Sequence, residues 1–287
     1  MKLKYGQIVI GKVIDENESH YFVQYEGVTY GVAKECTDET FAIGEQVEGL
    51  IYENRFGKRV MQTELPDIRP GYYGWGVVNS SRKDLGVFVD IGLQDKEVVL
   101  SLDDLPENRQ LWPKKQDKLY VTYEVDAKER MWAKLADYET IARLFKKAPK
   151  GMMNQTIEVT VFQVKLAGAL AITEQGYRVF IHESELTQAI RLGEQLSVRV
   201  INVARDGSLN GSMKPRAHEA IGDDAQMLMA ILEKSPTKYL GLHDKSNPDM
   251  IQSQLGISKA QFKRAVGQLL KQGKIRQEKN NGIYLVE

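Results

Sequence analysis

Residues 85–92 read LGVFVDIG. Valine and isoleucine alternate in this run with Phe88 and Asp90, and a glycine stands near each end. Alternation of this kind, with β-branched and aromatic side chains between turn-forming residues, is typical of a half-buried antiparallel strand. We therefore predict a β-strand at this place.

Four further short runs of the same kind lie around this one. They are separated by Gly, Asn, Asp and Ser, which favour turns. The connections are mostly too short for the crossover helices that parallel strands need, and this favours a meander that closes into a small barrel. The five predicted strands cover residues 74–78, 85–92, 97–100, 118–123 and 131–133.

The same order of strands occurs three times, at intervals of about 70 to 75 residues. The third copy closes with Asp206-Gly207, a strong hairpin signal. Its other predicted strands cover residues 157–161, 168–172, 177–181 and 196–200. The first copy covers residues 7–11, 21–25, 28–30 and 46–52, with a last hairpin that turns at residues 56–58.

Residues 136–145 are rich in helix formers, with apolar residues three and four apart, which predicts a short linking helix between the second and third copies. Proline and glycine mark boundaries at residues 65–71 and 148–151. We expect four domains, at residues 1–66, 67–146, 147–216 and 217–287.

The last segment has helical spacing. A first helix is expected to start near Asp223, because Ala225, Leu228, Met229 and Leu232 form an apolar stripe. A second helix is predicted to start at Asn247-Pro248, with asparagine as N-cap and proline at the first helical position, and to end by Gly256.

Ser258 is predicted to cap a third helix, with Gln261 at the reciprocal position of a capping box. Two short strands, at residues 274–277 and 283–286, follow Gly273. Helix, helix, turn, helix and hairpin make a winged helix. One interpretation places the third helix in a nucleic-acid groove, and the other is a structural or protein-binding winged helix. The first would use Lys259, Gln261, Lys263, Arg264 and, on the wing, Lys279 and Asn280.

Charge is balanced over the whole chain but not along it. The formal net charge is +0, yet residues 1–66 carry 7 basic and 11 acidic side chains, and residues 147–216 carry 9 and 6. Phosphate affinity is therefore expected towards the C-terminal half. The single Cys36 and four unclustered histidines give no zinc spacing, so no metal and no cofactor are predicted. With no apolar run of membrane-spanning length, a cytoplasmic protein without a membrane partner is expected.

The motif FIHESEL at residues 180–186, with Gly193-Glu194 and Asp206-Gly207 after it, resembles an S1-type RNA-binding domain, a five-stranded member of the OB-fold group. The order of the four segments resembles the conserved virulence factor B family, also called YitL-like. The resemblance implies a mainly β fold, with three OB-type antiparallel barrels in series and a small C-terminal α/β winged helix. It also implies RNA binding, an effect on virulence-factor expression after transcription, and no catalysis.

The resemblance further implies a site of aromatics, a histidine, an aspartate and a basic residue on each barrel. The second copy keeps Phe88, Asp126 and Arg130, and the third keeps Phe180, His182 and Asp206. The set is incomplete in every copy. Ser101 and Ala33 stand at the histidine position of the second and first copies, Leu170 stands where the second copy has Phe88, and Asn210 falls near the position of Arg130. The first copy offers Tyr21, Phe22, Tyr30, Arg55, Lys58 and Arg59.

Exposed aromatics beside cations can stack bases of single strands with little sequence preference. The alternative for each aromatic is core packing, and Trp75, Trp112 and Trp132 are expected in the core or at an interface. The alternative for His182 is a hydrogen bond within the turn. We predict a protein that binds single-stranded RNA on a surface shared by the second barrel, the third barrel and the winged helix.

Two other functions stay open. A DNA-binding regulator would be led by the locally basic winged helix. A nuclease accessory subunit would use the barrels to hold substrate. No phosphate-binding loop or dinucleotide fingerprint is visible, because Gly57-Lys58 and Gly74-Trp75-Gly76 lack the further glycines that these motifs need. We therefore predict that the protein is not an enzyme.

Overall fold

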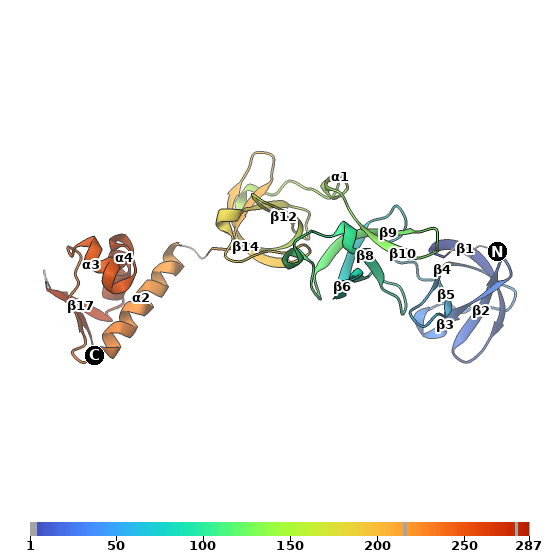
Figure 1. Ribbon diagram of the computed structural model, residues 1–287, viewed down its shortest axis with the longest axis horizontal. Coiled ribbons are helices and arrows are strands. Elements are labelled where there is room, and N and C mark those ends of the chain that lie inside the picture. The colour runs from blue at the N-terminus through green and yellow to red at the C-terminus, as the bar shows by residue number, and fades with distance from the viewer. Residues whose placement is uncertain (1–4, 215–216, 279–280, 287) are drawn as a thin grey trace. The chain divides into compact units, whose positions relative to one another are not determined.

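The computed structural model describes residues 5–214, 217–278 and 281–286. It divides into two compact units, Met1–Met213 and Lys214–Glu287. Figure 1 shows closed rings of strands in the first unit and helices with a small sheet in the second. In the described residues, no helix is long and apolar enough to cross a membrane.

The first unit consists of three closed five-stranded barrels with one strand order, in which the fifth strand lies between the third and the fourth. The first barrel has β1 (Gln7–Glu16), β2 (His20–Tyr25), β3 (Val28–Ala33), β4 (Gln46–Glu53) and β5 (Arg59–Gln62). The second has β6 (Gly74–Arg82), β7 (Gly86–Asp90), β8 (Val98–Ser101), β9 (Lys118–Val125) and β10 (Met131–Leu135). The third has β11 (Thr156–Lys165), β12 (Gly168–Ile172), β13 (Arg178–His182), β14 (Gln195–Val203) and β15 (Leu209–Ser212). The predicted mainly β fold of three barrels and a winged helix is confirmed.

One pair of strands in each barrel is parallel, which a purely antiparallel meander does not contain. These pairs are β3 with β5, β8 with β10, and β13 with β15. The direction follows from the connections. The fourth strand runs antiparallel to the first, so the fifth, joined to it by a hairpin, runs in the same direction as the third.

Side chains alternate between core and surface as the sequence predicted. Val87 and Val89 on β7 are fully buried, whereas Phe88 between them is half-buried. Gly86 has a φ of 137°, and a Cβ there would overlap the carbonyl oxygen of Leu100. Gly168 is the matching residue of the third barrel, with a φ of 138°. Only glycine fits at the start of the second strand in these two barrels.

The first two barrels share a core. Leu50, Tyr52 and Val60 of the first barrel belong to the apolar cluster that fills the second. The buried Tyr123 hydroxyl of the second barrel donates to the Gly6 carbonyl at 3.0 Å, and Tyr52 donates to the Gln94 carbonyl at 3.0 Å. Burial raises the pKa of both tyrosines well above the ordinary value. The junction is therefore apolar and closed by neutral hydrogen bonds.

The second and third barrels are joined by charge. Arg191 donates to Asp117 from Nε at 2.6 Å and from Nη2 at 2.9 Å, and to Glu194 from Nη1 at 2.6 Å. Both carboxylates are buried, and the hydrogen bonds to Asp117 raise the pKa of the guanidinium. Leu192 of the third barrel also enters the core of the second. These contacts hold the second and third barrels together.

The linking helix α1 (Tyr138–Ala142) is shorter than the predicted 136–145. Asp137 caps it and accepts a hydrogen bond from the Thr140 amide at 2.8 Å. The helix ends early because the chain after it pairs with the third barrel. The amide of Lys146 donates to the Gly176 carbonyl at 2.8 Å.

The second unit is a winged helix, with α2 (Ala217–Lys234), α3 (Pro248–Leu255) and α4 (Lys259–Lys271) around one apolar core. Its sheet has β16 (Tyr239–Leu240), β17 (Ile275–Glu278) and β18 (Gly282–Leu285), in the order β16-β18-β17. The predicted caps are confirmed. Asn247 caps α3, and Ser258 forms a complete capping box with Gln261 on α4.

Two features of this unit differ from the prediction. Helix α2 starts at Ala217 and not near Asp223. Strand β16 was not predicted. It has only two residues, too few to show an alternating pattern, and pairs Tyr239 with Tyr284 of β18.

Candidate nucleic-acid interface

One row of outward residues crosses the second barrel, and an equivalent row crosses the third. In the second barrel the row is Ser80, Phe88, Val99 and Trp132, on β6, β7, β8 and β10. Phe88, Val99 and Trp132 are each partly exposed, and their strand neighbours Val87, Leu100 and Met131 are buried. The two aromatic rings of this row are thus placed on the outside of the sheet, with the valine between them.

The last hairpin of the second barrel places a cation beside this row. Asp126 accepts from the backbone amides of Lys128 at 2.8 Å and Arg130 at 3.0 Å. It also accepts from Arg130 Nε at 2.8 Å and from Trp132 Nε1 at 3.1 Å. The Arg130 amide and guanidinium hold the pKa of this carboxyl well below its usual range. Asp126 therefore orients Arg130, whose guanidinium lies 5.2 Å from the centre of the Trp132 ring.

The equivalent row of the third barrel is Gln163, Leu170, Phe180 and Asn210. Its single aromatic, Phe180, sits on the third strand, where the second barrel has Val99. Asn210 occupies the place of Trp132 and not that of Arg130. Asn210 and Trp132 both pair with the third strand of their own barrel. Phe180 and His182 form an edge-to-face pair with ring centres 6.1 Å apart.

His182 has a structural role in its turn. Its Nδ1 accepts from the Ser184 amide at 3.1 Å, and the residue caps the short helix at Glu183–Glu185. Ser101 does the same in the second barrel, where its hydroxyl accepts from the Asp103 amide at 3.3 Å. Ala33 holds this place in the first barrel without a side-chain cap. The histidine position is thus a helix cap in the second and third barrels.

Asp126 and Asp206 occupy different places in their hairpins. Asp126 starts its turn, as Asn54 does in the first barrel, and Ala204 is the equivalent residue of the third. Asp206 lies two residues further on and accepts from the Ser208 amide at 3.0 Å. Hydrogen bonds from Ser208 lower the pKa of its carboxyl. The Asp206 Oδ2 atom lies 3.5 Å from Arg178 Nη2, so Asp206 orients this arginine only loosely.

A further hollow, of about 750 Å³, is lined mainly by the first barrel and, on one side, by Gln94 and Asp95 of the second. His20 and Phe22 stack there with ring centres 6.4 Å apart, and Phe56, 62% exposed, lies on the rim below Arg55. Lys58 and Arg59 also line this hollow. Tyr21 and Tyr30, which the sequence analysis named among the candidate binding residues of the first barrel, are buried in the core.

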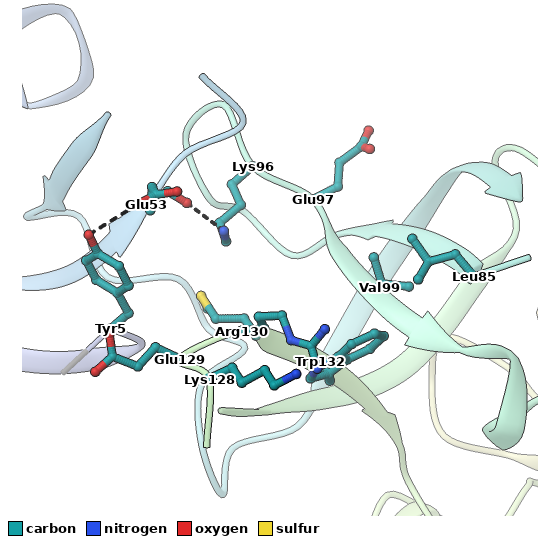
Figure 2. Close-up of a pocket in the computed structure, with 11 residues that line it drawn as sticks. Tyr5, Glu53, Leu85, Lys96, Glu97, Val99, Lys128, Glu129, Arg130 and Trp132 are labelled. Carbon is teal, nitrogen blue, oxygen red and sulfur yellow. Dashed lines mark hydrogen bonds between the residues drawn. The ribbon is translucent and has the colours of Figure 1, made fainter. Parts of the chain in front are cut away.

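A hollow of about 580 Å³ lies between the first two barrels (Figure 2). Arg130 and Trp132 form one side of it and Tyr5 and Glu53 the other, with Lys96 beside Glu53 (Figure 2). The Lys96 ammonium donates to the Glu53 carbonyl at 2.5 Å, and burial lowers the pKa of this lysine. Basic and acidic residues are equal in number here. The basic ones are Lys96, Lys128 and Arg130, and the acidic ones are Glu53, Glu97 and Glu129.

In the winged helix, Lys263 and Arg264 are exposed on α4 and Lys259 is half-buried. The Gln261 side chain is engaged, because its oxygen accepts from Ser258 and its nitrogen lies 3.4 Å from Asp224. Lys279 and Asn280 lie outside the described residues. Sequence reasoning missed the stack of Arg276 on Tyr284, 5.0 Å from the ring centre.

Trp132 is the main site residue that sequence reasoning assigned elsewhere, to the core or an interface. The signal was present in the alternation of its strand, since Met131 and Ala133 on either side are buried. Lys96 and Glu53 could not be found in this way. They meet only because the first two barrels pack together.

Four domain families match the chain. They are an S1 domain at residues 5–64, the CvfB first S1-like domain at 73–134, the second domain of virulence regulatory factor CvfB at 141–215, and the CvfB-like winged helix domain at 226–285. S1-like and winged-helix domains are typical of nucleic-acid-binding rather than catalytic proteins.

Whole-chain relatives agree. Conserved virulence factor B of Staphylococcus epidermidis is 34% identical over 270 residues, which cover 93% of this chain and 90% of that protein. The Bacillus subtilis protein YitL, described as uncharacterized, is 38% identical over 234 residues, covering 82% and 78%.

A solved structure also matches over almost its full length. This crystal structure, of a multidomain protein with nucleic acid binding domains from Streptococcus pneumoniae, has a TM-score of 0.72 and 44% identity, and the match covers 98% of each chain. With three barrels, a winged helix and relatives above 30% identity along most of its length, the chain belongs to the conserved virulence factor B family.

Proposed function

We propose that this protein binds single-stranded RNA on the outer faces of its barrels, with the second barrel as the principal platform. The observation that carries the proposal is the row that places Phe88 and Trp132 on one face, with Arg130 held against Trp132 by Asp126. Aromatic faces accept any base, and each stacked base contributes roughly 1 to 3 kcal/mol.

The charges around the row argue for stacking as the main source of affinity. The adjacent hollow has as many acidic as basic residues, so it does not attract phosphates by net charge. Arg130 is already paired with Asp126. Contacts to phosphates should therefore be few, and binding should depend only weakly on salt.

The first and third barrels extend this platform. Phe22 and Phe56 with Arg55 provide stacking surfaces on the first barrel, and Phe180 provides one on the third. Such weak sites in series strengthen one another through effective concentration. The proposed RNA-binding surface thus includes the first barrel, although the acidic composition of this barrel argued against RNA binding there. His182 and Asp206 support the third surface by holding its turns.

At the level of the cell, RNA binding would make the protein a cytoplasmic post-transcriptional regulator. The family name points to the expression of virulence factors as the regulated process. The similar S. pneumoniae protein, described as having nucleic acid binding domains, supports the general class of ligand.

The test is a fluorescence anisotropy titration of the full chain with labelled U-rich RNA and with duplex DNA across a salt series. We expect RNA to bind more tightly at physiological salt. We expect log K to fall with log salt with a slope of about −2, which corresponds to about three neutralised phosphates. Tighter binding of duplex DNA would overturn the proposal, as would RNA cleavage in the same tubes.

A second candidate is duplex DNA binding led by the winged helix. It rests on the exposed Lys263 and Arg264 of α4 and on the Arg276–Tyr284 stack of its sheet. The substitution pair Lys263→Ala and Arg264→Ala separates the two. If the winged helix binds duplex DNA, the two substitutions should weaken DNA binding strongly and should have no larger effect on RNA binding. If the barrels lead, RNA binding changes little.

A further inference from the structure

A third hollow, of about 430 Å³, lies between the second and third barrels. Its walls are mostly apolar and come from both barrels and from the linking helix. They include Leu111, Leu135, Tyr138, Phe162, Val164 and Leu192. The volume falls in the range of small-molecule pockets and suits a group the size of a nucleoside.

One polar atom in this hollow has no partner. Gln163 lines it, and its Oε1 is buried without a hydrogen bond among the residues that the structure describes. A buried amide left unpaired is unfavourable, because it has lost its hydrogen bonds to water and gained none in the protein. An uncompensated group of this kind marks a place where a ligand can supply the missing bond.

Gln163 also belongs to the outward row of the third barrel. It pairs with Leu170, which pairs with Phe180. The hollow therefore meets this row at its Gln163 end.

The walls are fixed before any ligand arrives. Tyr138, Phe145 and Phe162 pack together, with ring centres 5.9 to 6.4 Å apart. The Arg191 ion pairs hold the two barrels that form the hollow. A preformed apolar pocket binds a flat group without the entropy cost of ordering side chains.

The charged groups at the rim exclude phosphate. Asp104 and Asp137 are the acidic residues that line the hollow, and within the described part of the chain no basic side chain lines it. Asp104 is paired with Lys134 at 2.8 Å, and Asp137 caps α1. A neutral planar group is favoured inside, with any phosphate left outside.

We propose that this hollow receives one nucleobase of the bound single strand, and that the Gln163 side chain turns from its buried position so that its amide hydrogen-bonds to the edge of that base. The inference rests on the proposed function. Every nucleobase edge presents adjacent donors and acceptors that an amide can meet, so the pocket fixes the register of the strand on the third barrel. Gln163 contacts the RNA directly in this account.

The first test uses the full chain without RNA. Gln163→Met keeps the shape of the side chain and removes the buried unpaired amide, so the melting temperature should rise. Gln175→Met, on the exposed turn of the same barrel, is the matched control and should change nothing. A fall in melting temperature for Gln163→Met would mean that the amide is already satisfied and would overturn the inference.

The second test follows the side-chain amide resonances of the full chain by NMR as U-rich RNA is added. The pair of signals missing in Gln163→Met should shift, whereas the Gln175 pair should stay in place. A fully abasic oligonucleotide should leave both in place. Gln163→Met should also weaken RNA binding about fivefold, the effect of one hydrogen bond.

Two failures are distinguishable. If RNA shifts the resonances of β7 and β10 but not those of Gln163, the strand binds and the base pocket is refuted. If no resonance shifts, the proposed function and the inference that rests on it both fail.

Discussion

The two junctions within the three-barrel unit are built from different chemistry. Between the first and second barrels, a shared apolar core is closed by the neutral hydroxyls of Tyr52 and Tyr123. Between the second and third, Arg191 lies between the buried carboxylates of Asp117 and Glu194. The hollows beside the two junctions show the reverse contrast, because the charged hollow adjoins the apolar junction and the apolar hollow adjoins the charged one. The first is rich in charged groups, and the second is apolar apart from its acidic rim and Gln163.

This contrast shows that the repeats are alike in backbone and different in surface. Each barrel has the same strand order, but no barrel carries the complete set of residues that the resemblance to S1 domains implies. The hollows arise where two barrels meet. The proposed binding surface therefore combines the outer face of the second barrel with the hollows at the junctions, and substitutions at the two junctions should have separable effects on folding and on RNA affinity.

The largest expected effect is on the stability of the second junction. Arg191→Met leaves Asp117 and Glu194 buried without their cation, which should destabilise the first unit by about 3 to 5 kcal/mol. Urea unfolding of the full chain measures it. Arg82→Met, which breaks the exposed pair with Asp84, is the control and should stay within about 0.5 kcal/mol. Equal effects of the two would show that the second junction is not held by charge.

The next effect is on RNA affinity at the first junction. Trp132→Ala removes one stacking face and should weaken binding of U-rich RNA by roughly 1 to 3 kcal/mol, while Trp132→Phe should keep most of it. Anisotropy titration measures both. Trp75→Ala removes a 37% exposed tryptophan outside the row and serves as the control. A loss for Trp75→Ala as large as that for Trp132→Ala would contradict the assignment of the platform.

A smaller effect is expected from the neutral hydrogen bonds. Tyr123→Phe removes the donor to the Gly6 carbonyl and should cost about 0.5 to 1.5 kcal/mol of unfolding free energy. Tyr72→Phe, at a tyrosine that is 60% exposed, should be neutral. If Tyr123→Phe proved as damaging as Arg191→Met, the contrast between the two junctions would disappear.

The smallest effect concerns pH. The pKa of Asp126 is lowered in the folded protein, so its contribution to stability is present above the unfolded value of about 3.9 and is lost as the pH falls through the folded value. Thermal melts should show Asp126→Asn below the wild type at pH 7, with a gap that is constant from pH 5 to 8 and closes only in strong acid. A gap that narrows between pH 8 and 6 would show that the carboxyl is not held ionised by the Arg130 amide.

The sequence was sufficient for the elements that depend on local pattern. Alternation around Phe88 and the capping box of Ser258 and Gln261 are set by neighbours in the chain, and both occur as predicted. Local signals misled where long-range pairing intervenes. The linking helix is cut short because Lys146 pairs with Gly176 of the third barrel.

The candidate site was harder to predict because equivalent motifs are not equivalent in space. Asp126 and Asp206 look alike in sequence, but each lies in its own hairpin and their positions within the hairpin differ by two residues. Gln163 gave no signal, since its importance arises from a partner missing in a hollow that the second barrel helps to form. Packing between barrels is not encoded in any short motif.

The central claim is that the barrel faces, and the second barrel above all, bind the RNA. Photocrosslinking of 4-thiouridine-substituted RNA to the full chain, followed by mass spectrometry of the crosslinked peptides, tests it most directly. We predict crosslinks in the peptides that contain Phe88 and Trp132, with weaker ones at Phe180. Crosslinks confined to α4 and the sheet of the winged helix would contradict the claim.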